Sequence, residues 1–136
     1  MGYFEISVKN NVIDKKGNDK EVVNKYVVEG CELFAEAEQK GLSMPLNDPD
    51  VVAIRQSAIK EFANDPTGGE GEAIYIATIV DTFIKENGDE KKTKYKVALF
   101  AVSTTNANKI VQEYMAQGLE NMDCEEIKKT SFIDVI

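Results

Sequence analysis

The chain has 136 residues, 43% of them hydrophobic, and a net charge of −8 from 24 acidic and 16 basic side chains. This length and composition are typical of one compact domain with a core of useful size, and they argue against disorder. No apolar run approaches the roughly 20 residues that a membrane-spanning helix needs. The N-terminus lacks the charged and apolar regions of a signal peptide, so we expect a cytoplasmic protein.

The missing residue types exclude several kinds of active site. The chain has no histidine, which removes imidazole-based zinc sites and the Ser-His-Asp and Cys-His arrangements. Its two cysteines, Cys31 and Cys124, lie far apart and cannot form a thiolate zinc site, and a reducing compartment disfavours a disulfide between them. Carboxylate pairs remain available, but their positions before strands are typical of solvated, capping acids. We therefore predict no enzymatic activity, no cofactor and no metal site.

The first half of the chain begins with a strand. Phe4, Ile6 and Val8 alternate with polar residues, which is the pattern of a half-buried strand. A turn at 14–18 and a returning strand at 21–28 follow. We expect a helix over 32–40, ended by Gly41, and then a third strand over 50–62.

The second half repeats this order with clearer signals. Residues 74–80 and 94–100 read as two strands, and Asn87-Gly88 between them predicts a type I′ hairpin turn. The next helix is expected to begin at Ser103, a good N-cap residue, and to end at Gly118. Its apolar face has helical spacing and consists of Ala107, Ile110, Val111, Tyr114 and Met115.

The third strand of each half has nearly the same sequence. Residues 50–62 align with 123–135 at an offset of 73 (123 − 50), which pairs Ile54 with Ile127 and Arg55 with Lys128. The sequence therefore predicts an α+β fold of two tandem ββαβ repeats that form one pseudo-twofold domain over 1–136. The repeats would cover 3–62 and 73–136, joined by a linker at 63–72. The glycines of that linker lack the Lys-Ser/Thr of a phosphate-binding loop.

The repeated third strand is the leading candidate for a ligand site. In an extended strand Arg55 and Ser57 point to one face, and Lys128 and Thr130 are their counterparts in the second half. A cation beside a hydroxyl suits an anion such as phosphate. The alternative is purely structural: the strands pair in a sheet, and the two cations meet Glu61 or Asp134 of neighbouring strands.

The lysine-rich hairpin of the second half suggests another kind of site. Lys91, Lys92 and Lys94 precede Tyr95, and aromatic side chains beside lysines bind single-stranded nucleic acid by base stacking along a charged groove. The structural alternative is a solvated hairpin whose edge is protected by lysine. The net negative charge opposes binding to duplex DNA.

Three segments together resemble a known family. They are the aromatic-led first strand at 3–9, the strand at 26–28 with the acidic helix that follows it, and the closing segment at 127–135. In these the chain resembles a domain-of-unknown-function family of Bacteroides-type bacteria and their tailed, crAss-like phages. The chain departs from that family's pattern at Ile74-Tyr75, where a tryptophan is expected. The resemblance implies no active site, but it implies a small phage-associated protein in the host cytoplasm.

Together these features favour a non-enzymatic binding protein that captures a nucleotide-like or phosphorylated small ligand, as a counter-defence protein would. Two alternatives stay open: an accessory protein that binds single-stranded nucleic acid, and an acidic protein-interaction or inhibitor module. Free sheet edges also favour a homo-oligomer or a protein partner.

Overall fold

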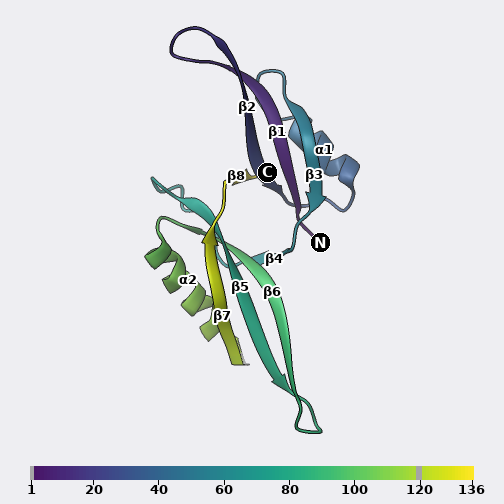
Figure 1. The fold of residues 1–136 in the computed structure, drawn as a ribbon, viewed down its shortest axis with the longest axis vertical. Coiled ribbons are helices and arrows are strands. Elements are labelled where there is room, and N and C mark those ends of the chain that lie inside the picture. Colours follow the sequence, from purple (N-terminus) through teal and green to yellow (C-terminus); the bar gives the residue numbers. More distant parts are fainter. Residues whose placement is uncertain (1, 119–120) are drawn as a thin grey trace. The chain divides into compact units, whose positions relative to one another are not determined.

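The computed structural model describes residues 2–118 and 121–136 and has a mixed α+β fold. Two helices and two four-stranded sheets make up the described chain (Figure 1). The chain divides into two compact units. Unit 1 consists of Met1–Ser57 and Ser131–Ile136, and unit 2 consists of Ala58–Thr130.

Unit 1 is a sheet with one helix on one of its faces. Its strands lie in the order β3-β1-β2-β8; β1 pairs antiparallel with β2 and β3, whereas β8 runs parallel to β2. Helix α1 (Phe34–Leu42) packs on β1 and β3. The strands are β1 (Phe4–Ile13), β2 (Asp19–Val28), β3 (Asp50–Gln56) and β8 (Phe132–Val135).

The core of unit 1 lies between the sheet and α1. Phe4, Ile6 and Val8 are buried on the face that meets α1, so the predicted alternation in the first strand is confirmed. The ring of Phe4 also meets the ring of Phe34 edge-on, with centroids 5.1 Å apart. The cluster is completed by Tyr26, Val28, Cys31 and Ala37.

Unit 2 has the same layered construction. Its strands lie in the order β4-β6-β5-β7; β5 pairs antiparallel with β6 and β7, whereas β4 runs parallel to β6. Helix α2 (Thr104–Ala116) packs on β6 and β7. The strands are β4 (Ile59–Phe62), β5 (Ala73–Ile84), β6 (Glu90–Ala101) and β7 (Asn121–Lys129).

The core of unit 2 confirms the predicted face of the second helix. Ala107 and Val111 are fully buried against alternate residues of β5 and β6, and Ile110, Tyr114 and Met115 pack at the margin. The N-cap prediction is also confirmed, because the Ser103 hydroxyl accepts a hydrogen bond from the Asn106 N–H at 3.0 Å.

The predicted type I′ turn is wrong. The Lys85 N–H donates to the Asp89 carbonyl and the Gly88 N–H donates to the Lys85 carbonyl, while only Gly88, not Asn87, has a positive φ (+89°). This pattern is a three-residue hairpin loop, in which a type I turn is followed by one left-handed glycine. The first hairpin closes in the same way, with Gly17 at φ +80°.

The predicted third strand is divided in both halves. Residues 50–62 form β3 and β4, which pair in different sheets, and 123–135 is likewise divided between β7 and β8. Each half of the sequence thus supplies the short parallel strand of the other unit. The breaks fall at Ser57 and Thr130, where the chain passes from one unit to the other.

Two helix ends differ from the sequence expectation. Helix α1 continues through Gly41, because this residue lies against the sheet and not beyond the last turn. Helix α2 ends before Gly118 without a left-handed residue there; the Gln117 and Gly118 N–H groups instead donate to carbonyls three residues earlier, which tightens the last turn.

Gly41 gives a test of the packing of α1. A Cβ at this position would lie 2.7 Å from Val51 Cγ2 and 2.9 Å from Ile6 Cδ1. Although Gly→Ala normally favours a helix by about 1 kcal/mol, we expect Gly41→Ala to lower the free energy of unfolding by roughly 1–3 kcal/mol through overpacking. Urea denaturation measures this. Gly69→Ala is the control, since its Cβ would meet only Thr67 Oγ1 at 3.4 Å; equal effects of the two changes would contradict the packing of α1.

Candidate functional site

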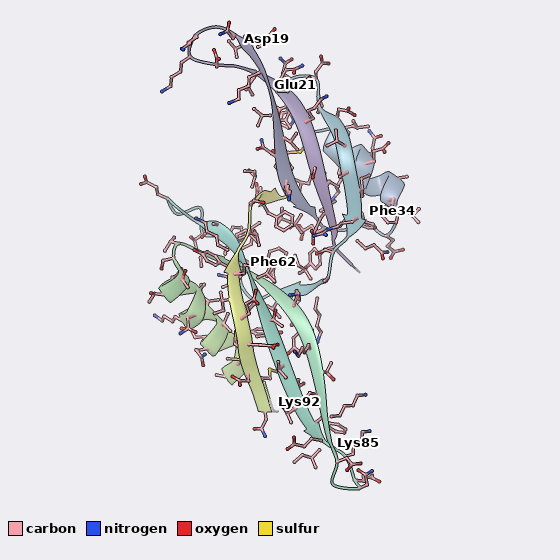
Figure 2. The ribbon with its side chains drawn as sticks, in the orientation of Figure 1. Asp19, Glu21, Phe34, Phe62, Lys85 and Lys92 are labelled. Carbon is pink, nitrogen blue, oxygen red and sulfur yellow. The ribbon has the colours of Figure 1, made fainter. Side chains whose placement is uncertain are left out.

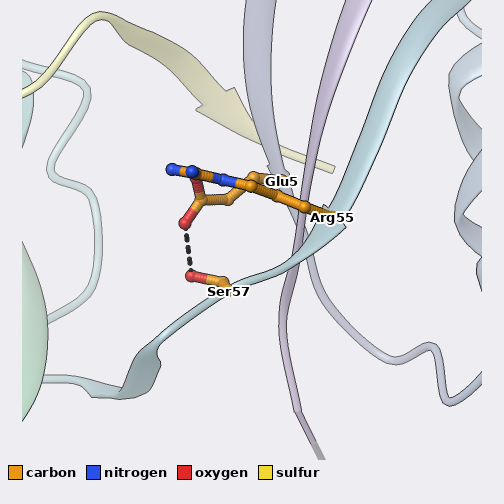
Figure 3. Close-up of polar contacts among 3 residues, drawn as sticks. All are labelled: Glu5, Arg55 and Ser57. Atoms are coloured by element: carbon orange, nitrogen blue, oxygen red, sulfur yellow. Dashed lines mark hydrogen bonds and ion pairs between the residues drawn. The ribbon is translucent and has the colours of Figure 1, made fainter.

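The predicted site residues Arg55 and Ser57 converge on one carboxylate, that of Glu5 (Figure 3). The Arg55 guanidinium donates to Glu5 Oε1 from Nε at 2.9 Å and from Nη2 at 2.6 Å. The Ser57 hydroxyl donates to Glu5 Oε2 at 2.7 Å. Both carboxylate oxygens are therefore held by charge-assisted or short hydrogen bonds.

Strand pairing explains this arrangement. Arg55 lies directly opposite Glu5 in the β1–β3 ladder, so their side chains project from the same face of the sheet. The Ser57 N–H donates to the Tyr3 carbonyl at 2.8 Å, which continues the ladder past the end of β3 and keeps the hydroxyl on that face. The Glu5 side chain is only 12% exposed, whereas that of Arg55 is 77% exposed. The guanidinium is thus open to solvent above a largely buried carboxylate.

The structure corrects the expected partner of Arg55. If the strands only pair in a sheet, the sequence predicts Glu61 or Asp134 as the partner of the cations, but the residue that binds the Arg55 guanidinium is Glu5. Glu61 instead accepts a short hydrogen bond from the Tyr114 hydroxyl of α2. Glu5 could be read from the sequence as an outward-facing residue of the first strand, but its partner depends on the register of β1 against β3, which no local pattern specifies.

The other two predicted site residues, Lys128 and Thr130, belong to unit 2, and both make contacts with residues of that unit. Lys128 is exposed and stands opposite Ile76 in the β5–β7 ladder, so it has no carboxylate where Arg55 has Glu5. The Thr130 N–H and hydroxyl both donate to the Ile74 carbonyl, at 3.0 and 2.7 Å. The structure thus brings Arg55 and Ser57 together, while the meeting of this pair with Lys128 and Thr130 stays a prediction.

The glycine-rich segment before β5 also encloses a carboxylate. Glu72 accepts hydrogen bonds from the Thr67 N–H at 3.1 Å, the Thr67 hydroxyl at 2.6 Å and the Gly68 N–H at 3.4 Å. The Thr67 hydroxyl is the main reason why the pKa of the Glu72 carboxyl is lowered. The backbone N–H groups of this loop do therefore bind an anionic group, but it is the side chain of the chain's own Glu72.

The lysine hairpin offers little basic surface. The segment 85–92 carries three lysines and three acids, namely Lys85, Lys91, Lys92, Glu86, Asp89 and Glu90 (Figure 2 labels Lys85 and Lys92). Lys94 forms an ion pair with Glu125, with Nζ and Oε2 3.0 Å apart. These acids offset the positive charge that a single-strand groove needs.

Tyr95 packs within unit 2. Its ring is half-buried beside the core of that unit and lies 4.3 Å below Lys60 Nζ, a cation–π contact. Its hydroxyl donates to Met122 Sδ at 3.6 Å, and burial raises the pKa of Tyr95. A ring held in this way has little surface left on which a base could stack.

The ends of the two β-hairpins expose apolar side chains at matching places. Val12 and Ile13 close β1 and are 37% and 70% exposed, and Phe83 and Ile84 close β5 and are 49% and 63% exposed. Each pair lies 71 positions from the other (83 − 12), the same offset that relates the two hairpin turns at Gly17 and Gly88. Sequence reasoning missed these residues because β-branched and aromatic residues at the end of a strand look like ordinary strand formers.

Within the described residues no group of three or more acidic, cysteine or histidine side chains is arranged to hold a metal ion. Cys31 and Cys124 are free thiols, the first buried and the second partly buried. Helix α2, with 13 residues, is the longest helix described, and no described helix has the length and apolar character needed to span a membrane.

Comparison with known proteins finds a family match over residues 2–136, nearly the entire chain. The family is described as a domain of unknown function, DUF4494. The chain belongs to this family. Comparisons of this DUF4494 chain with curated proteins and with solved structures returned no match.

The Glu5–Arg55–Ser57 cluster of this DUF4494 protein gives a stability prediction. Arg55→Ala leaves a largely buried carboxylate without its cationic partner, and we expect it to lower the free energy of unfolding by about 1–2 kcal/mol after allowance for the exposure of the guanidinium. Lys128→Ala is the matched control, because Ile76 stands opposite it, and it should change stability by less than about 0.5 kcal/mol. Guanidinium chloride denaturation compares the two. Similar losses in both variants would show that the cluster does not stabilise unit 1.

Proposed function

We propose that the chain is a non-enzymatic binding protein that captures a nucleotide-like or phosphorylated small ligand through Arg55 and Ser57. The supporting observation is that the Arg55 guanidinium and the Ser57 hydroxyl donate hydrogen bonds to the two carboxylate oxygens of Glu5. A phosphate likewise presents one oxygen to a guanidinium and another to a hydroxyl, and it carries more charge than a carboxylate. Glu5 would then occupy the anion site until a ligand replaces it.

The surroundings of Ser57 support a ligand with an apolar part. A pocket of about 340 Å³ in unit 1 is lined by Gly2, Tyr3, Phe4, Cys31, Glu32, Gln56 and Ser57. The Phe4 ring belongs to the core, so the aromatic ring offered to a ligand is that of Tyr3. One such ring beside a hydroxyl and an amide suits a base or a ribose, because stacking and a few placed polar groups fix such ligands. The exposed guanidinium leaves the phosphate side of the ligand accessible from solvent.

The proposal extends to the second half of the chain. We infer that the two halves are tandem repeats with a pseudo-twofold relation, and that Lys128 and Thr130 provide a second cation and hydroxyl. The shared strand order of the two sheets supports the repeat. The setting that we propose, a phage-associated counter-defence protein in the host cytoplasm, rests on the resemblance of the first strand, the acidic helix and the closing segment.

Isothermal titration with cyclic nucleotides and ADP-ribose derivatives tests this function. The wild-type chain should bind one of these classes saturably, and Arg55→Ala should abolish binding. Glu5→Gln removes the charge that competes for the guanidinium and should tighten binding by about tenfold, which corresponds to roughly 1.4 kcal/mol. Lys109→Ala, an exposed lysine on α2, is the control and should leave binding unchanged.

Three results would decide against the ligand proposal. Binding that survives Arg55→Ala would place the ligand elsewhere. Weaker binding in Glu5→Gln would mean that Glu5 helps to bind the ligand and does not compete with it. A response only to a short single-stranded oligonucleotide, with a steep dependence on salt, would favour the nucleic-acid alternative through Lys91, Lys92, Lys94 and Tyr95.

A second candidate function is favoured by the exposed apolar ends of the hairpins. Val12 and Ile13 in unit 1 and Phe83 and Ile84 in unit 2 occupy matching positions, and their surroundings are balanced in charge. Exposed apolar groups without an excess of positive charge suit a protein surface better than a nucleic acid. This would make the chain a protein-interaction or inhibitor module.

Tip variants test the second candidate. We expect Phe83→Ser with Ile84→Ser to remove a partner that the wild-type chain retains in affinity capture from the host cell, because the loss of two exposed apolar side chains reduces the contact without disturbing the core. The control is Val102→Ser, which changes an apolar residue that is 51% exposed and follows the end of β6 opposite the Phe83 tip. Retention of the same partner by the double variant would rule the tips out as its binding site.

A further inference from the structure

Strand β7 lies at an open edge of the sheet of unit 2. It pairs with β5 on one side, and no strand of the described chain pairs with its other side. With nine residues it is longer than the other edge strands, since β3 has seven and β4 and β8 have four each. Alternate backbone N–H and C=O groups along that edge are available to another strand.

The exposed side chains of β7 are ordered by charge. Asp123, Glu125 and Glu126 occupy its first part, whereas Lys128 and Lys129 close it, and all five are exposed. Because Glu125 already pairs with Lys94 of β6, the acids that matter for a partner strand are Asp123 and Glu126. The residues that face α2, Met122, Cys124 and Ile127, pack against the core of unit 2. The strand therefore has one buried face and a charged, accessible edge that is acidic in its first part and basic at its end.

Two copies of β7 have complementary charges only when the two strands run antiparallel. When two copies of β7 run antiparallel, the acidic part of each faces the basic end of the other, whereas a parallel pair sets like charges side by side. Opposite charges across a strand pair are favourable and like charges are not. Lysines scattered along an edge usually prevent association, but here acids and lysines are separated in a way that an antiparallel copy would satisfy.

The total charge restricts the choice of partner as well. Two chains that each carry −8 repel one another at long range. Association of two copies therefore needs a local surface at which opposite charges meet. Among the edge strands, β7 combines the greatest length with such a surface, whereas β4 and β8 are too short to form an extended ladder.

We propose that β7 pairs antiparallel with β7 of a second copy of the chain and joins two unit 2 sheets into one continuous sheet of eight strands. Such an interface is isologous, because the same strand faces itself about a twofold axis. The central residues of the ligand proposal, Arg55 and Ser57, lie in unit 1 and outside this dimer interface. Lys128, which the ligand proposal adds as a second cation, lies on β7 and belongs to both proposals.

Sedimentation equilibrium of charge-reversed chains tests the proposal. Lys128→Glu with Lys129→Glu makes the exposed edge acidic throughout, and we expect the dimer to dissociate at a protein concentration at least about tenfold higher than that of the wild type. Asp123→Lys with Glu126→Lys makes the edge predominantly basic and should weaken self-association too. A mixture of the two variants should form a one-to-one heterodimer, because each edge then meets the opposite charge.

The control makes the same change in net charge at a different place on the chain. Lys15→Glu with Lys16→Glu alters the first hairpin turn by the same total charge, and should leave the wild-type dimer intact. Circular dichroism checks that each variant remains folded, and Lys129→Glu alone replaces the double variant if that one unfolds. A monomeric wild type at its highest soluble concentration would overturn the proposal. So would equal weakening by the edge and turn variants, or a mixture that forms no heterodimer.

Discussion

The fold depends on short strands that the two halves of the sequence supply to each other's sheets. Strand β4 follows β3 along the chain but pairs with β6, and β8 follows β7 but pairs with β2. Each of these strands is parallel to its partner, so it cannot arise from a local hairpin and must come from a distant part of the chain. Neither sheet reaches four strands without this contribution, and ordering such distant segments carries a loop-closure cost that local pairing does not.

Several contacts fix these short strands in place. In unit 1 the Ile136 N–H donates to the Val27 carbonyl and the Glu29 N–H donates to the Ile136 carbonyl, which extends the ladder to the last residue. In unit 2 the Asn64 side chain pairs with the backbone of Phe100 in both directions, at 2.8 Å each, and the rings of Phe62 and Phe100 stack. Directional bonds of this kind specify register, which a four-residue apolar strand could not do by packing alone.

A second feature recurs where the chain could bind anions. Arg55 and Ser57 bind the Glu5 carboxylate, and the backbone N–H groups of Thr67 and Gly68 bind the Glu72 carboxylate. In both cases an internal acid satisfies donors that would otherwise attract a phosphate or another anion. The two differ in exposure, because the Glu5 side chain is largely buried beneath an accessible guanidinium, whereas the Glu72 loop stands at the surface. This difference is why Arg55 and not the glycine-rich loop carries the proposed ligand site.

The sequence by itself determined the local structure and the likeness of the two halves. Period-two alternation marked Phe4, Ile6 and Val8 as a buried strand face, and helical spacing with Ser103 as the cap marked α2, because these signals depend only on neighbouring residues. Only the tertiary structure decided that the third strand breaks at Ser57, that its two parts pair in different sheets, and that Glu5 lies opposite Arg55. Those features depend on strand register and on pairing between distant segments, and the free energy that selects among such pairings comes from the assembled sheet and core rather than from any short stretch of the chain.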